Sequence, residues 1–233
     1  MISTSKAAYG RGVLDAAPFI LVVVPFAMVF GLVAVQAGLP VVEVLAFSGA
    51  VIAGAAQFTA LGLMSDGAPT AIVLLTALAV NLRMAMYSAA LAPYLGTAPL
   101  WQRALAAYAL FDQTYAASAL RFEQNPDWSV HMRMAYFAGS ATPVVPGWMA
   151  GTLIGALTGG AMPEGLALDF AMPICFLALV GPMLRTAGHL AAAGTAIVLA
   201  LALAWMPYSL NVIVAGLVAM LVGAEVERRR AAR

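Results

Sequence analysis

The sequence predicts an all-α protein embedded in a membrane, a polytopic bundle of about eight transmembrane helices, some interrupted by proline. Of its 233 residues, 64% are hydrophobic and 9% are charged, and the mean hydropathy is +0.95. Soluble globular domains are only ~45–50% apolar. The apolar residues also gather in runs of about 20, the length that an α-helix needs to cross a bilayer. We therefore expect a single membrane domain that occupies residues 1–233.

The expected spans follow the apolar runs in order. Only a short turn, residues 38–40, separates the first two, so these form a helical hairpin. The fourth is the least hydrophobic because it holds Gln102, Arg103, Asp112 and Gln113. Its alternative is an amphipathic helix on the membrane surface, but the topology closes only if it crosses. The expected spans are 13–37, 41–64, 69–92, 101–120, 134–157, 165–184, 186–205 and 208–223.

Positive charges predict the orientation of these spans. If the N-terminus is cytoplasmic and the spans alternate, only Arg103 lies outside and Arg83 lies within the membrane. Cytoplasmic loops are enriched in lysine and arginine. The distribution therefore predicts a multi-pass protein of the inner (plasma) membrane with both termini in the cytoplasm. The residues on the inner side are Lys6, Arg11, Arg121, Arg133, Arg185, Arg228, Arg229, Arg230 and Arg233.

Composition and motifs exclude several classes of function. The net charge of +1 gives no reason to expect nucleic acid as a partner, and the few charged residues leave little room for an extramembrane domain. Cys175 is the only cysteine, which rules out an internal disulfide or a cysteine-based metal cluster. The chain has neither an H-E-x-x-H run nor a Gly-x-Ser-x-Gly elbow. We therefore expect no enzyme activity, no metal and no cofactor.

Arg83 stands in the middle of the third expected span, where an arginine costs about 2.5 to 3.5 kcal/mol by insertion scales. It lies about ten residues before the outer end of its span, and Asp112 lies about eleven residues after the outer start of the next. At ~1.5 Å per residue, both are roughly 15 Å below the outer surface. Every other acidic residue falls in a loop or near a helix end. We predict that Arg83 and Asp112 form an ion pair, directly or through water.

Two interpretations of this pair remain open. In the first, the pair is static and locks two helices together. In the second, it faces a wet cavity in which Asp112 takes up a proton and releases Arg83, so that proton flow is coupled to movement of a solute.

Two amides are further candidates for such a cavity. Asn81 is two residues from Arg83, so the two side chains point to nearly opposite faces of a regular helix. Gln57 lies among small residues of the second span. It is either a cavity group or the donor of an interhelical hydrogen bond worth about 0.6 kcal/mol.

Prolines occur in pairs in the first expected span (Pro18, Pro25) and in the fifth (Pro143, Pro146), and Pro173 lies in the sixth. Proline removes a helical hydrogen bond, and interrupted helices in corresponding halves point to a transporter's substrate site. Two halves of four spans would have the same orientation, however, and they show no clear similarity in sequence. The eight-span count therefore does not predict an inverted repeat.

The order of several short motifs resembles the AzlC-type large subunit of branched-chain amino-acid exporters. These motifs cover most of the first 120 residues, and the most specific are Gly-Ala-Ala-Gln-Phe (54–58) and Asn-Leu-Arg (81–83). Asp112-Gln113-Thr114-Tyr115 follows them, with Gln113 where members of the family commonly carry a second acid. This departure leaves Asp112 as the sole candidate proton carrier. The predicted substrate-binding or proton-coupling residues are Gln57, Asn81, Arg83, Asp112, Gln113 and Tyr115.

The resemblance implies export of valine, leucine, isoleucine and methionine from the cytoplasm, together with a short multi-span partner of the AzlD type. The residues leave other functions open: a scaffold that transports nothing, or a carrier or channel for another small polar solute. The direction, the coupling ion and association with further copies of the same chain are also open.

Overall fold

The computed structural model describes residues 4–159, 184, 186–206 and 210–231. These residues form helices and connecting turns without any strand, which confirms the all-α class. The chain divides into two compact units: Met1–Phe58 with Val80–Leu166, and Thr59–Ala79 with Ala167–Arg233. The first of these, called unit 1 below, carries the candidate site.

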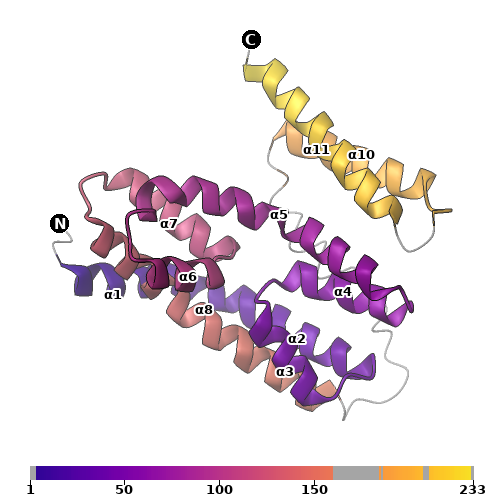
Figure 1. The fold of residues 1–233 in the computed structure, drawn as a ribbon, viewed down its shortest axis with the longest axis horizontal. Coiled ribbons are helices and arrows are strands. Elements are labelled where there is room, and N and C mark those ends of the chain that lie inside the picture. Colours follow the sequence, from indigo (N-terminus) through magenta and orange to yellow (C-terminus); the bar gives the residue numbers. More distant parts are fainter. Residues whose placement is uncertain (1–3, 160–183, 185, 207–209, 232–233) are drawn as a thin grey trace. The chain divides into compact units, whose positions relative to one another are not determined.

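Two long helical stretches that run in parallel form the frame of unit 1 (Figure 1). The first is α1 (Ser5–Ala16), a 3-10 turn at Ala17–Phe19 and α2 (Ile20–Gln36), which together make 32 continuous residues. The second is α8 (Val130–Gly159), 30 residues long. Either is longer than the ~20 residues needed to cross a bilayer. We call the end where α1 and α8 begin the α1 end, and the opposite end the α2 end.

Glycines bring the backbones of this pair into direct contact. A Cβ on Gly12 would overlap the carbonyl oxygen of Tyr136, and one on Gly155 would overlap that of Met28. Contacts of the same kind repeat along the pair in parallel order, at Gly31, Gly139, Gly151 and Gly159. Small residues let membrane helices approach this closely. The glycines of α8 are therefore a packing surface for the stretch Ser5–Gln36.

The prolines do not break these helices. Pro25 lies inside α2, and Pro143 and Pro146 lie inside α8, while Pro18 falls in the 3-10 turn. The chain is interrupted elsewhere. The second expected span, 41–64, is divided into α3 (Val41–Ala50) and α4 (Gly54–Ser65). The fourth, 101–120, is divided into α6 (Leu100–Tyr108) and α7 (Asp112–Gln124). Each of these two ranges therefore contains two helices.

The first divided segment is a hairpin whose tip points towards the α1 end. α3 runs antiparallel to α8. Ser48 contacts Thr152, whereas Ile52, four residues later, belongs to a cluster with the earlier α8 residues Trp148 and Val144. After residues 51–53 the direction reverses. The Phe58 ring of α4 lies 5.1 Å from Phe26 and 5.5 Å from Phe30 of α2, between ring centroids. The chain thus enters and leaves from the α2 end.

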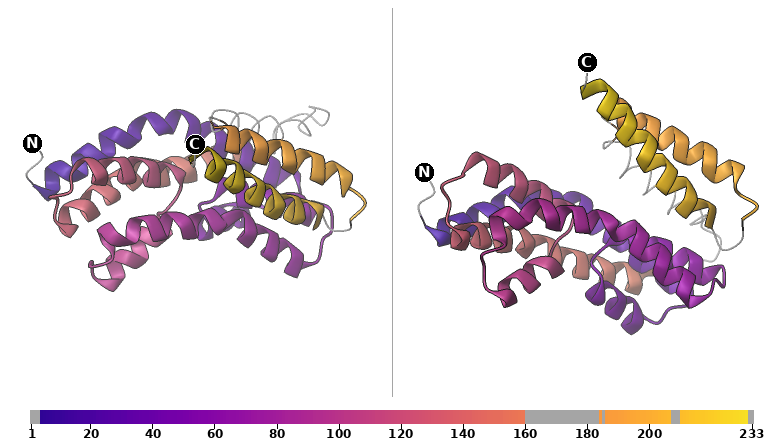
Figure 2. Two further views of the ribbon diagram at one scale, coloured as in Figure 1. Left: turned by 90° about the horizontal axis from the view of Figure 1, so that it is seen from above. Right: turned by 45° about the horizontal axis from the view of Figure 1, so that its top comes forward.

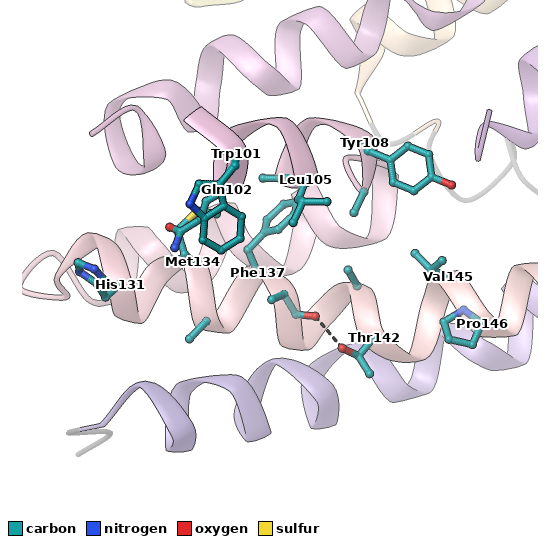
Figure 3. A pocket seen from close by; sticks show the side chains of 15 residues that line it. Trp101, Gln102, Leu105, Tyr108, His131, Met134, Phe137, Thr142, Val145 and Pro146 are labelled. Carbon is teal, nitrogen blue, oxygen red and sulfur yellow. Dashed lines mark hydrogen bonds between the residues drawn. The ribbon is translucent and has the colours of Figure 1, made fainter. Parts of the chain in front are cut away.

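The second divided segment is a hairpin of the opposite direction. Figure 3 shows α6 running along α8, with Trp101 and Gln102 beside Met134 and with Tyr108 farther along, towards Val145. After residues 109–111 the chain returns as α7. Phe111 packs with Val144, whereas the ring of Phe122 lies 6.1 Å from that of Tyr136, near the start of α8. This hairpin therefore enters and leaves from the α1 end.

These elements form an inverted repeat that the sequence does not reveal. In each copy a long helix leads into a broken hairpin: α2 into α3 and α4, then α5 (Thr70–Leu95) into α6 and α7. The two breaks lie 58 residues apart, at 51–53 and 109–111. Residues 80–95 of α5 run opposite to the stretch Ser5–Gln36, since Arg83 lies beside the second break in the middle of unit 1 and Leu95 packs with Ala8 of α1. The second copy thus has the opposite direction.

The second unit includes α10 (Ala187–Ala202) and α11 (Leu210–Ala231), an antiparallel pair (Figure 2). The Thr186 hydroxyl donates to Glu227 Oε1 at 2.8 Å, which joins the start of α10 to the last turns of α11. The sixth expected span, with Pro173 and Cys175, lies outside the described residues. Within the described part, three helical stretches are long and apolar enough to cross a membrane: Ser5–Gln36, Thr70–Leu95 and Leu210–Arg230.

Candidate functional site

The tips of the two hairpins meet in the middle of unit 1. The hydroxyl of Tyr108, the last residue of α6, donates to the carbonyl oxygen of Gly49 near the end of α3, at 2.5 Å. Ile52 and Phe111, one from each break, belong to the same buried cluster. A broken helix frees backbone groups that are tolerated at membrane depth only where protein or water surrounds them. Here each break helps to surround the other.

Thr114 stabilises the second break. Its Oγ1 accepts the Phe111 N–H at 3.1 Å and donates to the Ala109 carbonyl at 2.8 Å, and its side chain is fully buried. Two backbone groups that the break leaves without helical partners are therefore satisfied by one hydroxyl. This hydrogen bonding holds Asp112 at the first position of α7, where the positive end of the helix dipole favours a carboxylate.

Replacing Thr114 by valine should destabilise unit 1. The change leaves the buried Phe111 N–H without a hydrogen-bond acceptor and removes one donor from the Ala109 carbonyl, at a cost of about 1 to 3 kcal/mol. We expect a lower melting temperature of the purified protein in detergent. The control is Thr158→Val on α8, because that residue is exposed and, within the described part of the chain, its hydroxyl bonds only carbonyls of its own helix. Equal melting temperatures of the two variants would contradict this role of Thr114.

The predicted ion pair is present at the start of α7. Arg83 Nη1 lies 3.1 Å from Asp112 Oδ2, and their side chains are 23% and 29% exposed. The Tyr87 hydroxyl, one turn after Arg83 on α5, donates to Asp112 Oδ1 at 2.9 Å. The Tyr87 ring stacks on that of Tyr115, with centroids 4.1 Å apart. A carboxylate is thus held between a guanidinium and a phenol, beside the hairpin tips.

The pair forms for a different reason from the one the sequence suggests. Asp112 is not in the middle of a crossing helix but follows directly after a break. Asn81 lies in an uninterrupted part of α5, and its buried Oδ1 has no hydrogen-bond partner. Arg83 Nε is likewise buried without one. Gln113 follows Asp112 on α7 and is half-buried.

Gln57 belongs to a separate polar group inside the first hairpin. Its Nε2 donates to Ser48 Oγ at 3.1 Å, and Ser48 Oγ lies 3.2 Å from Thr152 Oγ1 of α8. All three residues are fully buried. The amide nitrogen thus forms the interhelical hydrogen bond that was one of two interpretations, while Gln57 Oε1 is buried without a partner.

Sequence reasoning missed a second, partly buried acid that is paired with arginine. Asp15 lies within the continuous stretch Ser5–Gln36 rather than beside a loop. Its Oδ2 accepts from Arg121 Nη2 at 2.6 Å and from the Tyr136 hydroxyl at 2.8 Å, and its Oδ1 lies 2.9 Å from Arg11 Nε. Because Arg121 was expected in a cytoplasmic loop, its ion pair with Asp15, which joins α7 to α1, could not be foreseen. Tyr87 and Tyr108 were missed as well.

An apolar cavity of about 640 Å³ lies between α6 and α8 (Figure 3). Among the described residues that line it there is no Asp, Glu, Lys or Arg, and its polar groups include Gln102, His131 and Thr142. Charges of both signs lie instead at the meeting point of the two hairpins, in the pair Arg83 and Asp112.

Comparison with known proteins gives the family. The chain is 29% identical over 182 residues to the "Inner membrane protein YgaZ" of Escherichia coli (strain K12), covering 75% of this chain and 73% of that protein. It is 28% identical over 190 residues to an "Uncharacterized membrane protein" of Archaeoglobus fulgidus, covering 79% and 80%. No solved structure matches. The family model described as "AzlC protein" matches residues 18–162, which include both hairpins and the ion pair, and the chain therefore belongs to the AzlC family of membrane proteins.

Proposed function

We propose that the protein is a secondary transporter of the inner membrane that exports neutral amino acids, above all those with branched side chains. Its substrate site lies at the hairpin tips, and an AzlD-type small subunit is its partner. The observation that carries the proposal is the ion pair between Arg83 and Asp112 beside two broken helices of opposite direction. Sites of secondary transporters are commonly built at such interrupted helices, at the interface of inverted repeats.

The chemistry of an amino acid fits this site. The substrate ammonium would bind Asp112 and the substrate carboxylate would bind Arg83, so that both charges of the zwitterion replace the internal pair. The Gly49 carbonyl, released by Tyr108, is a further acceptor for the ammonium. A proton on Asp112 would remove the attraction for both Arg83 and the ammonium, which couples substrate release to protonation.

We further propose that the two hairpins are re-entrant, each entering the membrane and returning to the same face. The second and fourth expected crossings then become loops that stop at mid-membrane, and six crossings remain. With the N-terminus in the cytoplasm, Arg103 moves to the cytoplasmic face. All ten Lys and Arg residues other than Arg83 are then on the inner side, which agrees with the positive-inside rule without exception.

Cysteine labelling separates this topology from eight crossings. In a Cys175→Ser background, Thr97→Cys between α5 and α6 should be protected from a membrane-impermeant maleimide in intact cells, because the re-entrant arrangement places it inside. Eight crossings would place it outside. Ala37→Cys and Asp127→Cys are the controls, since both arrangements place the first outside and the second inside, and all three positions are exposed. Labelling of Thr97→Cys equal to that of Ala37→Cys would rule out the re-entrant second hairpin.

The direct test of function is efflux. Cells that express the chain with its candidate small subunit should release preloaded leucine and valine faster than cells with either subunit alone. A protonophore should slow this release, because the proton gradient drives it. Stable insertion of both subunits without faster release of any neutral amino acid would favour a scaffold role or another solute.

A further inference from the structure

A second pair of opposite charges lies at the other end of α7. Arg121, in the last turn of α7, pairs with Asp15 of α1. Asp112, in the first turn, pairs with Arg83 of α5. Nine residues separate the two positions on α7, a rise of about 13 Å along the helix. α7 is therefore held at both ends by ion pairs to different helices.

A cavity of about 360 Å³ opens beside the second pair. Asp15, Arg121, Gln124 and Tyr136 form its polar part, and the apolar part includes Phe19 and Leu120. Its size falls within the ~300–1,000 Å³ that is usual for small-molecule sites. It differs from the apolar cavity between α6 and α8 because charges of both signs line its wall.

The two charged side chains are available to a ligand. They are only partly covered, with 19% of Asp15 and 23% of Arg121 exposed. A guanidinium has five N–H donors, and Arg121 uses only part of this capacity: Nη2 donates to Asp15 Oδ2, and the guanidinium also contacts Tyr136. Its other donors can bind a carboxylate.

We propose that this cavity is an entry site for the same zwitterionic, apolar amino acid on the cytoplasmic side of the protein. The substrate ammonium binds Asp15, its carboxylate binds Arg121, and its side chain lies against Phe19 and Leu120. The proposal rests on the proposed export function and on the cytoplasmic placement of the α1 end. It adds a site before the hairpin tips and assigns a role to residues outside the predicted set.

Occupation of the entry site has a mechanical consequence for α7. A substrate carboxylate on Arg121 competes with Asp15, so the end of α7 loses its tie to α1. The other end of the same helix carries Asp112, which faces the hairpin tips. Binding at the entry site therefore loosens α7, the helix that also holds Asp112 in its pair with Arg83.

The test is leucine transport by inside-out vesicles that contain the chain and its small subunit. Asp15→Asn and Arg121→Gln should each raise the KM for leucine at the cytoplasmic face by about 10- to 100-fold, as expected for the loss of a hydrogen bond to a charged group. The maximal rate should stay within about twofold of wild type, once entry is saturated. Glu123→Gln, an exposed acid on α7, and Arg103→Gln are the controls and should leave KM unchanged.

Substrate analogues assign each charge. Leucinamide lacks the carboxylate and isocaproate lacks the ammonium. Arg121→Gln should weaken inhibition by isocaproate but not by leucinamide, because it removes only the partner of the carboxylate. Asp15→Asn should do the reverse, because it removes only the partner of the ammonium. Arg121→Lys keeps the charge and should give an intermediate KM, which covers the case in which Arg121→Gln fails to fold.

The outcomes separate the two proposals. If the wild type transports leucine but the variants lower only the maximal rate or the amount of folded protein, the second pair is structural and the entry site is wrong. If the wild type moves no neutral amino acid in these vesicles or in cells, the export function itself fails. If KM rises and the analogues respond as described, both proposals are supported.

Discussion

Asp112→Asn should strongly reduce net efflux of leucine at equal abundance in the membrane. Asparagine has nearly the same size as aspartate and can still accept the hydrogen bond from Tyr87, but it carries neither a charge for the substrate ammonium nor a titratable proton. Truncating one partner of a hydrogen-bonded charge pair costs about 2 to 5 kcal/mol, and the partial exposure of this pair lowers that figure. We expect a loss of at least about tenfold in the initial rate of efflux.

The double variant Arg83→Gln with Asp112→Asn distinguishes a working pair from a static one. Glutamine and asparagine can hydrogen-bond to each other, so the double variant restores a contact between α5 and α7 without any charge. If the pair only joins helices, the double variant should recover efflux that either single change has lost. We expect no recovery, because substrate and proton both need the charges. Asp66→Asn, in an exposed turn, is the control for loss of a carboxylate.

Gly12→Ala should prevent stable folding, whereas Gly10→Ala, two residues earlier on the same helix, should be tolerated. A Cβ on Gly12 would overlap the Tyr136 carbonyl oxygen and would lie 2.8 Å from the Ser140 nitrogen, both backbone atoms of α8. The two long helices would have to separate. Overpacking of this kind costs about 1 to 3 kcal/mol or more. A Cβ on Gly10 meets nothing within 4 Å, and alanine favours the helix by about 1 kcal/mol.

The measurement is the melting temperature in detergent and the fraction of monodisperse protein after extraction. Gly12→Ala should lower both values, and Gly10→Ala should keep or raise the melting temperature. Gly155→Ala should behave as Gly12→Ala does, because its Cβ would overlap the Met28 carbonyl oxygen. Equal stability of the Gly10 and Gly12 variants would mean that the α1 and α8 backbones are not in contact at this point.

The sequence alone predicts the helical class and the ion pair, because both follow from charges and apolar runs. Arg83 is conspicuous in an apolar run. Asp112 was the only acidic residue expected near the middle of a span, because every other acid falls in a loop or near a helix end. The breaks could not be foreseen. The first falls at Val51, Ile52 and Ala53, which include no proline or glycine, and Val51 takes an extended conformation with φ −139° and ψ 103°.

Hydropathy also does not show whether an apolar run continues in one direction or reverses. An apolar run of 20 residues has the length of a crossing whether it continues or turns back after ten, and 41–64 and 101–120 both turn back. The prolines do not mark the breaks. Each proline removes only one helical hydrogen bond, and a helix that is packed tightly against a neighbour can continue without it. The inverted repeat has a period of about 58 residues, so a comparison of the two halves of the chain misses it.

The close contact between the two long helices limits what can move. Side chains that interdigitate can change rotamers and let helices slide, but carbonyl oxygens that rest against glycine Cα atoms have no such freedom. The stretch Ser5–Gln36 and α8 are therefore expected to move as one rigid body. If the protein exports its substrate as proposed, exchange between inward-open and outward-open states within unit 1 has to come from the hairpins, whose arms are 9 to 13 residues long. Unit 1 thus combines one rigid pair of long helices with two short hairpins that can move against it.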